Sequence, residues 1–459
     1  MSILPPAAAD LSTHVPVLVA GGGACGLVAA LAAHDAGAEV VVIERDPLPR
    51  GSTSMSLGAL CAAGSADQAR HGIDDGPDRF IADVMAKTHG TADPVIARIV
   101  AEHCGPALDW LADRYDVLLP LDLLWPPAFG HSRARMHVSP GRSGADLMDR
   151  LIAACDAAGV TILTQARLTG LIADGDRIHG VRYVRPDGRE EHIGCGALIL
   201  ATCGFGGNHA MFAQHVPAMA DARYFGWEGN QGDGILLGTA AGAAVGDMNA
   251  YQGLGLLADP QGVDVNPRFL IEGGIQVNRA GARFSHELAD ISGQGARVIA
   301  QPDGLAWVIY DARIDKSCAD LPQYVALKAA GGIRSADTAS ALATRIGIDA
   351  DGLITTLASI ANGEADAFGR VFDTPPLAPP FFAIRVTGAV FHTQGGLLIG
   401  SDARVLKTDG TAFDNLFAGG GAARGISGSG PSGYLPGAGL ASAIALGRVA
   451  GRSAARLTV

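Results

Sequence analysis

The sequence is poor in aromatic residues, at 5%, and its cysteines form no recognisable motif. There are seven cysteines, an odd number, without a C-x-x-C, C-x-x-C-H or zinc-ligand spacing, so we predict no disulfide framework, haem attachment or metal site. Basic residues are also outnumbered, with 34 Lys and Arg against 46 Asp and Glu and a net charge of -12. That balance argues against nucleic acid or an anionic membrane surface as a partner.

Long hydrophobic runs are missing as well. No apolar stretch approaches the about 18 residues that a membrane-spanning helix needs. The opening residues, MSILPPAAADLSTH, lack the basic start and apolar stretch of a signal peptide. We therefore expect a soluble, cytoplasmic protein in a reducing compartment, with no membrane span.

The chain does have enough apolar residues, 48% of 459, to build a sizeable core. At roughly 100–200 residues per domain, its length predicts two or three domains, or one large domain with an insertion. Glycine is in excess, with 63 residues and no collagen-like period, which indicates tight turns and close backbone approaches.

The first segment has the pattern of a nucleotide-binding β-α-β unit. A strand over 15–20 runs into Gly21-Gly22-Gly23-Ala24-Cys25-Gly26, a helix follows to about Ala36, and a second strand over 39–43 ends at Glu44. The glycines match G-x-G-x-x-G in the strand-to-helix context that gives this pattern meaning. A helix start of this kind holds a pyrophosphate, and the acidic residue accepts hydrogen bonds from a ribose.

Further blocks along the chain resemble the flavoprotein family of succinate dehydrogenase and fumarate reductase. They include the loop 50–58 after Glu44, Ala197–Gly206, Asn230–Gly234, His392-Thr-Gln-Gly-Gly396 and Gly437–Ile444. The blocks follow the family's order over nearly the whole chain. The resemblance implies an α/β fold in which a Rossmann-like FAD-binding domain, 1–249 and 383–459, carries an inserted α+β capping domain, 250–382. It places the active site between the two domains.

The resemblance implies FAD as the cofactor. Some members bind FAD covalently through a histidine in the loop after the acidic residue, but no histidine stands between His34 and His71, so we expect non-covalent FAD. The predicted cofactor-binding residues are Gly21, Gly23, Ala24, Cys25, Gly26, Glu44, Arg45, Gly51, Ser52, Thr53, Ser54, Gly58, Ala166, Ala201, Thr202, Cys203, Gly204, Asn208, Asp233, Gly420, Gly437, Leu440 and Ala441.

The substrate end departs from the family. Fumarate reductases grip a dicarboxylate with arginines and histidines, but an ungapped alignment puts Leu254, Leu270, Ile291 and Tyr434 at those positions. Of the positions compared, only His392 keeps its residue type. The resulting apolar pocket cannot balance two buried carboxylates.

The stretch Tyr434-Leu-Pro-Gly-Ala438 resembles instead the substrate clamp of 3-ketosteroid dehydrogenases in the same family. There a tyrosine hydroxyl and a backbone N–H four residues on, here Ala438, hold a ketone oxygen while charge develops on it. The resemblance implies abstraction of the α-proton and transfer of the β-hydrogen as hydride to flavin N5. Tyr251 is the candidate base, and His392 is a candidate substrate ligand.

Each of these residues also has a structural interpretation. Tyr434 and Tyr251 would be packing residues, and His392 a structural histidine beside the flavin. His286 is a candidate acid or base or a helix-surface residue. Arg283 and Glu287 are expected to pair and fix the insert against the cofactor domain, and Arg424 either contacts a substrate carboxylate or faces solvent.

The predicted function is therefore FAD-dependent oxidation of a CH–CH bond, with a cyclic or steroid-like ketone desaturated next to its carbonyl. The alternatives are an ene-reductase of an unsaturated carboxylic acid, of the fumarate reductase type, and a flavin-binding protein without turnover. Since the chain shows no second nucleotide-binding unit for NAD and no haem motif, the electrons are expected to pass to an external acceptor: a quinone, dioxygen or a carrier protein.

Overall fold

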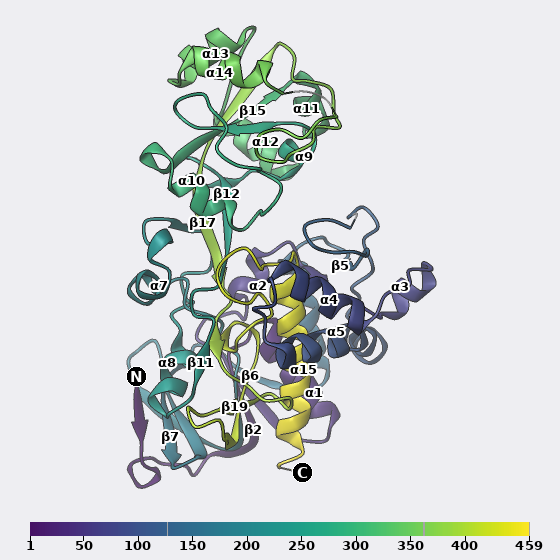
Figure 1. Ribbon diagram of the computed structural model, residues 1–459. Helices are drawn as coiled ribbons and strands as arrows, with labels where there is room; N and C mark the ends of the chain where they lie inside the picture. Colours follow the sequence, from purple (N-terminus) through teal and green to yellow (C-terminus); the bar gives the residue numbers. More distant parts are fainter. Residues whose placement is uncertain (126, 361–362, 459) are drawn as a thin grey trace. The chain divides into compact units, whose positions relative to one another are not determined.

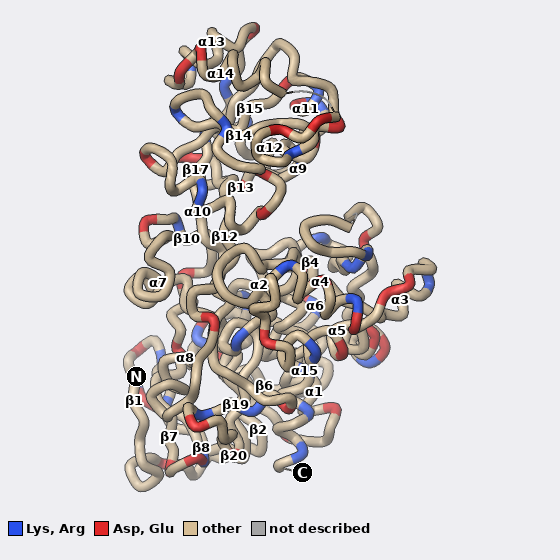
Figure 2. Tube along the Cα trace, in the orientation of Figure 1, with Lys and Arg blue, Asp and Glu red and all other residues tan. Residues whose placement is uncertain are grey.

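A computed structural model describes residues 1–125, 127–360 and 363–458 of the chain (Figure 1). The chain divides into two compact units. Unit 1 comprises Met1–Val216, Gly226–Tyr251 and His392–Val459, and unit 2 comprises Pro217–Phe225 and Gln252–Phe391. Acidic and basic residues are interspersed along both units (Figure 2).

Unit 1 is built on a nine-stranded sheet. Its centre has the parallel order β20-β9-β2-β3-β6, and β8, β7 and β1 extend it beyond β9. The strands are β1 (Ser2–Leu4), β2 (His14–Ala20), β3 (Val40–Ile43), β6 (Thr161–Leu163), β7 (Arg167–Asp174), β8 (Arg177–Val184), β9 (Glu190–Leu200), β19 (Arg404–Leu406) and β20 (Ala412–Ala418). Parallel strands buried on both faces need continuous apolar runs, which β2, β3 and the end of β9 supply.

Two small two-stranded sheets complete the strands of unit 1, β4 (Ala59–Cys61) with β5 (Met136–Val138) and β11 (Val245–Gly246) with β18 (Gly396–Leu397). The helices are α1 (Ala24–Asp35), α2 (Gly51–Met55), α3 (Ala66–Arg70), α4 (Pro77–Lys87), α5 (Pro94–Tyr115), α6 (Gly144–Ala157), α7 (His209–His215), α8 (Asp233–Ala240) and α15 (Ala438–Ala455). Helices α1 and α15 pack closely, because Gly447 and Gly451 of α15 lie against the backbone of Cys25 and Ala29.

Unit 2 contains a seven-stranded sheet with the order β13-β12-β17-β15-β14, to which β10 and β16 add at β17. Its strands are β10 (Arg223–Tyr224), β12 (Tyr251–Ala258), β13 (Val263–Asp264), β14 (Ile275–Val277), β15 (Leu305–Asp311), β16 (Ile333–Ala336) and β17 (Phe381–Thr393). Its helices are α9 (Arg268–Ile271), α10 (Gln294–Ile299), α11 (Ala312–Ser317), α12 (Pro322–Ala329), α13 (Ala339–Ile346) and α14 (Ala350–Ala358).

The bounds of unit 2 differ from the predicted insert, 250–382. The return to unit 1 comes only after Phe391, because β17 pairs with β15 and β16 over 381–387 and with β10 at Ala389 and Val390. The short segment Pro217–Phe225 also joins unit 2, since β10 adds to the same strand. Among the helices that the structure describes, none combines the length and apolarity needed to cross a membrane.

Candidate active site

The glycine turn between β2 and α1 has the geometry that the sequence predicts. Gly21 has a φ of +108°, which glycine adopts without strain. A Cβ at Gly26 would overlap the carbonyl oxygen of Gly21, so only glycine lets the helix start so close to the strand. At Gly23 a Cβ would meet only Thr53 Oγ1, at 3.8 Å, so this part of the turn remains open to a ligand.

Glu44 fixes this turn as well as ending β3. Its Oε2 accepts a hydrogen bond from Gly22 N at 2.7 Å, and its Oε1 accepts one from Asp46 N at 2.9 Å. Burial raises the pKa of this carboxyl, and the two backbone donors act in the opposite direction. A carboxylate has about four acceptor sites, so lone pairs remain for a ribose diol.

The predicted Gly-Ser-Thr loop after Glu44 is partly the short helix α2. Thr53 Oγ1 accepts from Ala24 N at 3.2 Å, which ties α2 to the first turn of α1. Ser52 Oγ accepts from Asn230 Nδ2 at 2.7 Å and lies 3.5 Å from Cys203 Sγ. The loop, the start of α1 and the residues after β9 thus form one cluster.

Asp233 brings a buried carboxylate to the start of α8. Its Oδ2 lies 3.6 Å from Arg45 Nη1, while its Oδ1 is buried without a hydrogen-bond partner among the described residues. Burial raises the pKa of Asp233. A buried acceptor with no protein partner indicates that a ligand donor completes this site.

Several other predicted cofactor residues already have structural roles. Asn208 caps α7: its Oδ1 accepts from Met211 N and its Nδ2 donates to the Gln231 carbonyl, so its amide is occupied. Cys25 is packed against Gly419 and Gly420, and burial raises the pKa of its thiol to about 12. Ala166 N donates to the Glu44 carbonyl at 2.8 Å, and Ala201 N to Ala20 at 2.8 Å.

The remaining predicted cofactor residues line the same strand ends and helix starts. Thr202 Oγ1 accepts from Gly234 N at 3.0 Å, which joins the end of β9 to α8. Ser54 Oγ of α2 donates to the carbonyl of Arg50, the residue just before this helix. The positive-φ glycines among them are Gly51, Gly58, Gly420 and Gly437, and Gly204 lies against Thr393.

The N-terminus of α15 is the second candidate ligand-binding helix start. Gly437 is its N-cap, and Leu440 and Ala441 lie in its first turn. In the following position, Ser442 Oγ is buried with no hydrogen-bond partner in the part of the chain that the structure describes. An 18-residue helix places partial positive charge at this end, which favours an anionic group.

These residues fit FAD. The open start of α1 suits a pyrophosphate, and Glu44 retains acceptor capacity for a ribose. The buried Asp233 Oδ1 and Ser442 Oγ are polar atoms that a bound cofactor would satisfy.

His392 and Tyr434 lie together at the start of α15. Their rings are in edge contact, with centroids 5.6 Å apart, and both residues are largely but not fully covered by protein. Burial raises the pKa of Tyr434, while backbone hydrogen bonds from Gly437 and Gly439 act in the opposite direction. Burial also lowers the pKa of His392 to about 4, so this histidine is neutral near pH 7.

The predicted second donor of the clamp, the Ala438 N–H, already has an acceptor within the chain. Ala438 N donates to the Leu435 carbonyl at 3.1 Å, because the chain turns tightly into α15. The backbone N–H groups that lower the pKa of the Tyr434 phenol, against the larger effect of burial, are those of Gly437 and Gly439. Gly439 also faces His392, since a Cβ there would lie 3.4 Å from Nε2.

Two site residues were missed by the sequence analysis. Gln394 Nε2 contacts His392 Nδ1 at 2.8 Å, and Ser427 Oγ donates to Gln394 Oε1 at 3.1 Å. Gln394 follows His392 by two positions on an extended segment, so alternation on the strand already places both side chains on one face.

Two other candidate residues, Tyr251 and Arg424, make contacts with other parts of the protein. Tyr251 is buried and packs edge-on against Phe212, with centroids 6.2 Å apart. Arg424 is not available for a substrate carboxylate, because its guanidinium donates to Asp93 and Asp247, each at 2.6 Å.

Arg283 and Glu287 do form the predicted ion pair, at 2.8 Å, but its other partners, Arg370 and Asp366, lie in unit 2 as well. The network therefore stabilises the interior of unit 2. Burial lowers the pKa of His286, whose Nδ1 accepts from Leu288 N at 3.3 Å.

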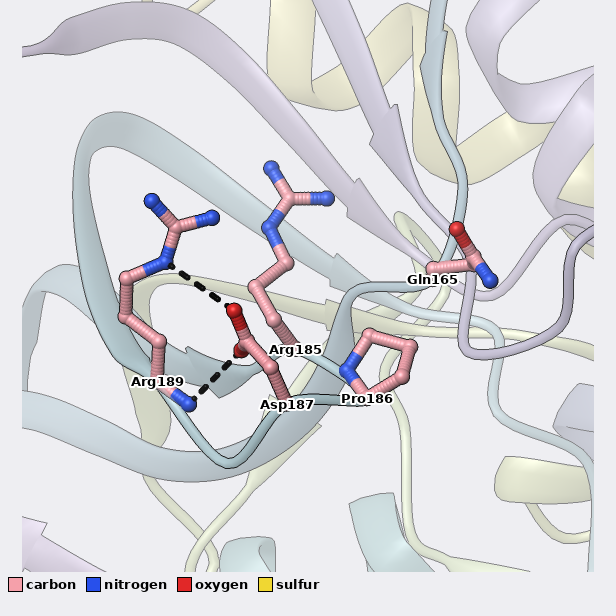
Figure 3. A pocket seen from close by; sticks show the side chains of 5 residues that line it. All are labelled: Gln165, Arg185, Pro186, Asp187 and Arg189. Carbon is pink, nitrogen blue, oxygen red and sulfur yellow. Dashed lines mark hydrogen bonds and ion pairs between the residues drawn. The ribbon is translucent and has the colours of Figure 1, made fainter.

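A surface pocket of about 340 Å³ lies elsewhere in unit 1, at the turn between β8 and β9 (Figure 3). It is lined by Gln165, Arg185, Pro186, Asp187 and Arg189. Glu191 lies 3.1 Å from Arg185 Nε and 3.2 Å from Arg189 Nε, so the cations of this pocket are paired.

Comparison with known proteins supports FAD as the cofactor. A family model described as an FAD binding domain matches residues 16–442. The probable fumarate reductase Ifc3 of Shewanella frigidimarina is 30% identical, over 98% of this chain and 76% of that protein. An NADH:fumarate oxidoreductase of Klebsiella pneumoniae is 28% identical, over 96% of this chain but only 47% of that protein.

Solved structures have the same fold. The open conformation of a flavocytochrome c3 fumarate reductase matches with a TM-score of 0.85 at 28% identity, over 99% of this chain and 80% of that one. A 3-ketosteroid-Δ4-(5α)-dehydrogenase of Rhodococcus jostii, solved with 4-androstene-3,17-dione, matches with a TM-score of 0.81 at 24% identity, over 99% and 100%. Because the family model matches most of its length, the chain belongs to the FAD binding domain family. Its relatives show that it is an FAD-dependent oxidoreductase of the class that acts on CH–CH bonds.

Proposed function

We propose that the protein desaturates a cyclic or steroid-like ketone next to its carbonyl. The observation that carries this proposal is the pair of neutral side chains, Tyr434 and His392, in contact at the start of α15. Neutral donors suit an uncharged carbonyl oxygen, whereas a buried carboxylate needs a cation.

The residues divide the work as follows. Burial raises the pKa of the Tyr434 hydroxyl, so it keeps its proton and can donate it in a hydrogen bond to the ketone oxygen. This donor and the positive end of α15 stabilise the negative charge that forms on that oxygen when the α-proton leaves. Tyr251 is the proposed base for that proton. Bound FAD supplies the acceptor for the β-hydrogen and its electron pair, so a C=C bond forms.

The electrons must then leave the protein. A quinone, dioxygen or a carrier protein is the proposed acceptor. The best ketone found in a screen would allow the acceptors to be compared by their rates of reoxidation.

A second candidate function is reduction of an unsaturated carboxylic acid. Relatives named as fumarate reductases support it, as does the segment His392–Gly396. Against it stand the apolar residues at the positions aligned with the dicarboxylate ligands. Two of them, Leu254 and Leu270, are buried in the apolar core of unit 2. An anaerobic panel of ketones and unsaturated acids, followed at the flavin absorption band, separates the two functions.

Succinate and fumarate are expected to be poor substrates. Because Arg424 is paired with Asp93 and Asp247 and His392 is neutral, neither supplies an unpaired positive charge for a dicarboxylate. Succinate should not bleach the flavin anaerobically, and fumarate should not reoxidise the reduced protein above the rate without substrate. Rapid turnover of either compound would overturn the ketone proposal in favour of the second candidate.

We further propose that FAD is bound without a covalent link. The described chain from β3 to the end of α2 holds no histidine, the residue expected to carry such a link. Acid precipitation should release all flavin into the supernatant, and mass spectrometry should identify it as FAD. Yellow colour that stays with the pellet would contradict this.

A further inference from the structure

A buried chain of hydrogen bonds ends on His392. Ser427 Oγ donates to Gln394 Oε1 at 3.1 Å, and Gln394 Nε2 contacts His392 Nδ1 at 2.8 Å. Ser427 and Gln394 are 1% and 6% exposed, so water cannot substitute for these contacts. The backbone of Gln394 is held on both sides, by Ala250 O and Gly425 N.

The direction of these bonds follows from counting hydrogens. Among the residues that the structure describes, Ser427 Oγ has only the Gln394 amide as a hydrogen-bond partner. If the amide were rotated by 180°, its N–H would face Ser427 and the buried serine proton would have no acceptor, which is costly. The satisfied arrangement places Oε1 toward Ser427 and the amide N–H toward His392.

His392 Nδ1 must then be the acceptor. The other group near Nδ1, the Thr393 carbonyl, lies at 3.5 Å and cannot compete with the 2.8 Å contact. A neutral imidazole that accepts at Nδ1 carries its proton on Nε2. Nε2 faces the first turn of α15, where a Cβ on Gly439 would lie 3.4 Å from it.

We propose that Gln394, oriented by Ser427, is a positioning residue that keeps the proton of His392 on Nε2, where it donates to the carbonyl oxygen of the substrate. The substrate oxygen then accepts hydrogen bonds from two side chains, those of Tyr434 and His392. The substrate part of this inference rests on the proposed ketone function, but the tautomer does not.

The tautomer can be measured directly. The protein with bound FAD would be labelled with ¹⁵N in its 13 histidines, and the His392 signals assigned by comparison with His392→Phe. We expect Nδ1 to resonate as an unprotonated nitrogen and Nε2 as a protonated one. A proton found on Nδ1 in the wild type overturns the proposal.

Two substitutions should reverse the tautomer. Gln394→Glu offers only acceptors, and Gln394→Met leaves Nδ1 with the Thr393 carbonyl alone, so both favour a proton on Nδ1. Gln68→Met is the matched control, because it removes another buried glutamine of unit 1, whose Nε2 donates to Asp75 and Ala134. It should leave the His392 spectrum unchanged. An unchanged His392 signal in both Gln394 variants overturns the proposal.

A kinetic measurement tests the substrate part. Flavin reduction by the best ketone in single turnover should slow about tenfold in Gln394→Met, the effect of one lost hydrogen bond, with FAD content unchanged. A rate equal to that of the wild type, despite a reversed tautomer, shows that His392 does not touch the oxygen and overturns the donor role. If no ketone reduces the flavin while the wild-type proton is on Nε2, the proposed function fails and the positioning role of Gln394 stands.

Discussion

Tyr434→Phe should slow flavin reduction by the best ketone about 10²–10³-fold, or roughly 3–4 kcal/mol of barrier, because it removes one preplaced donor from the developing oxyanion. The ring is retained, so its edge contact with His392 should persist. FAD content and thermal stability should therefore change little. Single-turnover reduction under anaerobic conditions is the measurement, because it isolates the step before the electron acceptor.

Tyr183→Phe is the control for loss of a phenol in the same unit, since the Tyr183 hydroxyl donates to Glu191 on the neighbouring strand β9. Its reduction rate should equal that of the wild type. Agreement of the Tyr434→Phe rate with the wild type within about threefold, or roughly 0.65 kcal/mol, would make Tyr434 a packing residue and end the ketone-clamp hypothesis.

The second large effect is expected at Arg135, whose side chain is fully buried between Asp75 and Asp83. Its Nε donates to Asp75 at 2.6 Å, and the guanidinium lies 5.0 Å from the Phe80 ring centroid. Arg135→Leu leaves the Asp75 carboxylate buried without a counter-charge and should lower the free energy of unfolding by about 3–5 kcal/mol. Urea unfolding followed by release of FAD measures the effect in unit 1.

Two controls separate charge burial from packing. Arg189→Leu removes an arginine whose side chain is 65% exposed, and should change the free energy of unfolding by less than about 0.5 kcal/mol. The double variant Arg135→Leu/Asp75→Leu removes the stranded carboxylate and should recover much of the loss. A single Arg135→Leu variant that loses less than about 1 kcal/mol would show that water reaches the site.

The cofactor end was predictable because its requirements are local. The strand over 15–20 and the glycines after it correspond to β2 and the start of α1. Each depends on neighbouring residues, which a linear pattern can report. By contrast, the strand β1 carries no strong pattern and exists because it pairs with β7, in which Gly170 lies opposite Ser2, 168 positions further along the chain.

The substrate end was predictable only in part, because its contacts join residues that are far apart in the sequence. Tyr434 and His392 could be named, but their contact joins segments whose approach depends on the whole of unit 1. The engagement of the Ala438 N–H by Leu435 depends on how the turn enters α15, a detail of one hydrogen bond. Ser427 could not be recognised from the sequence, because its partner, Gln394, lies 33 positions earlier.

The close packing of α1 against α15 has a consequence for synthesis of the protein. Ten of the twelve residues of α1 are buried, and α15 covers part of that surface. About 400 residues separate the two helices, so at roughly 5–20 residues per second the ribosome needs about 20–80 s to deliver the second helix. During that time the alanine- and leucine-rich surface of α1 lacks its partner, so the FAD-binding unit completes its folding only after translation has reached α15.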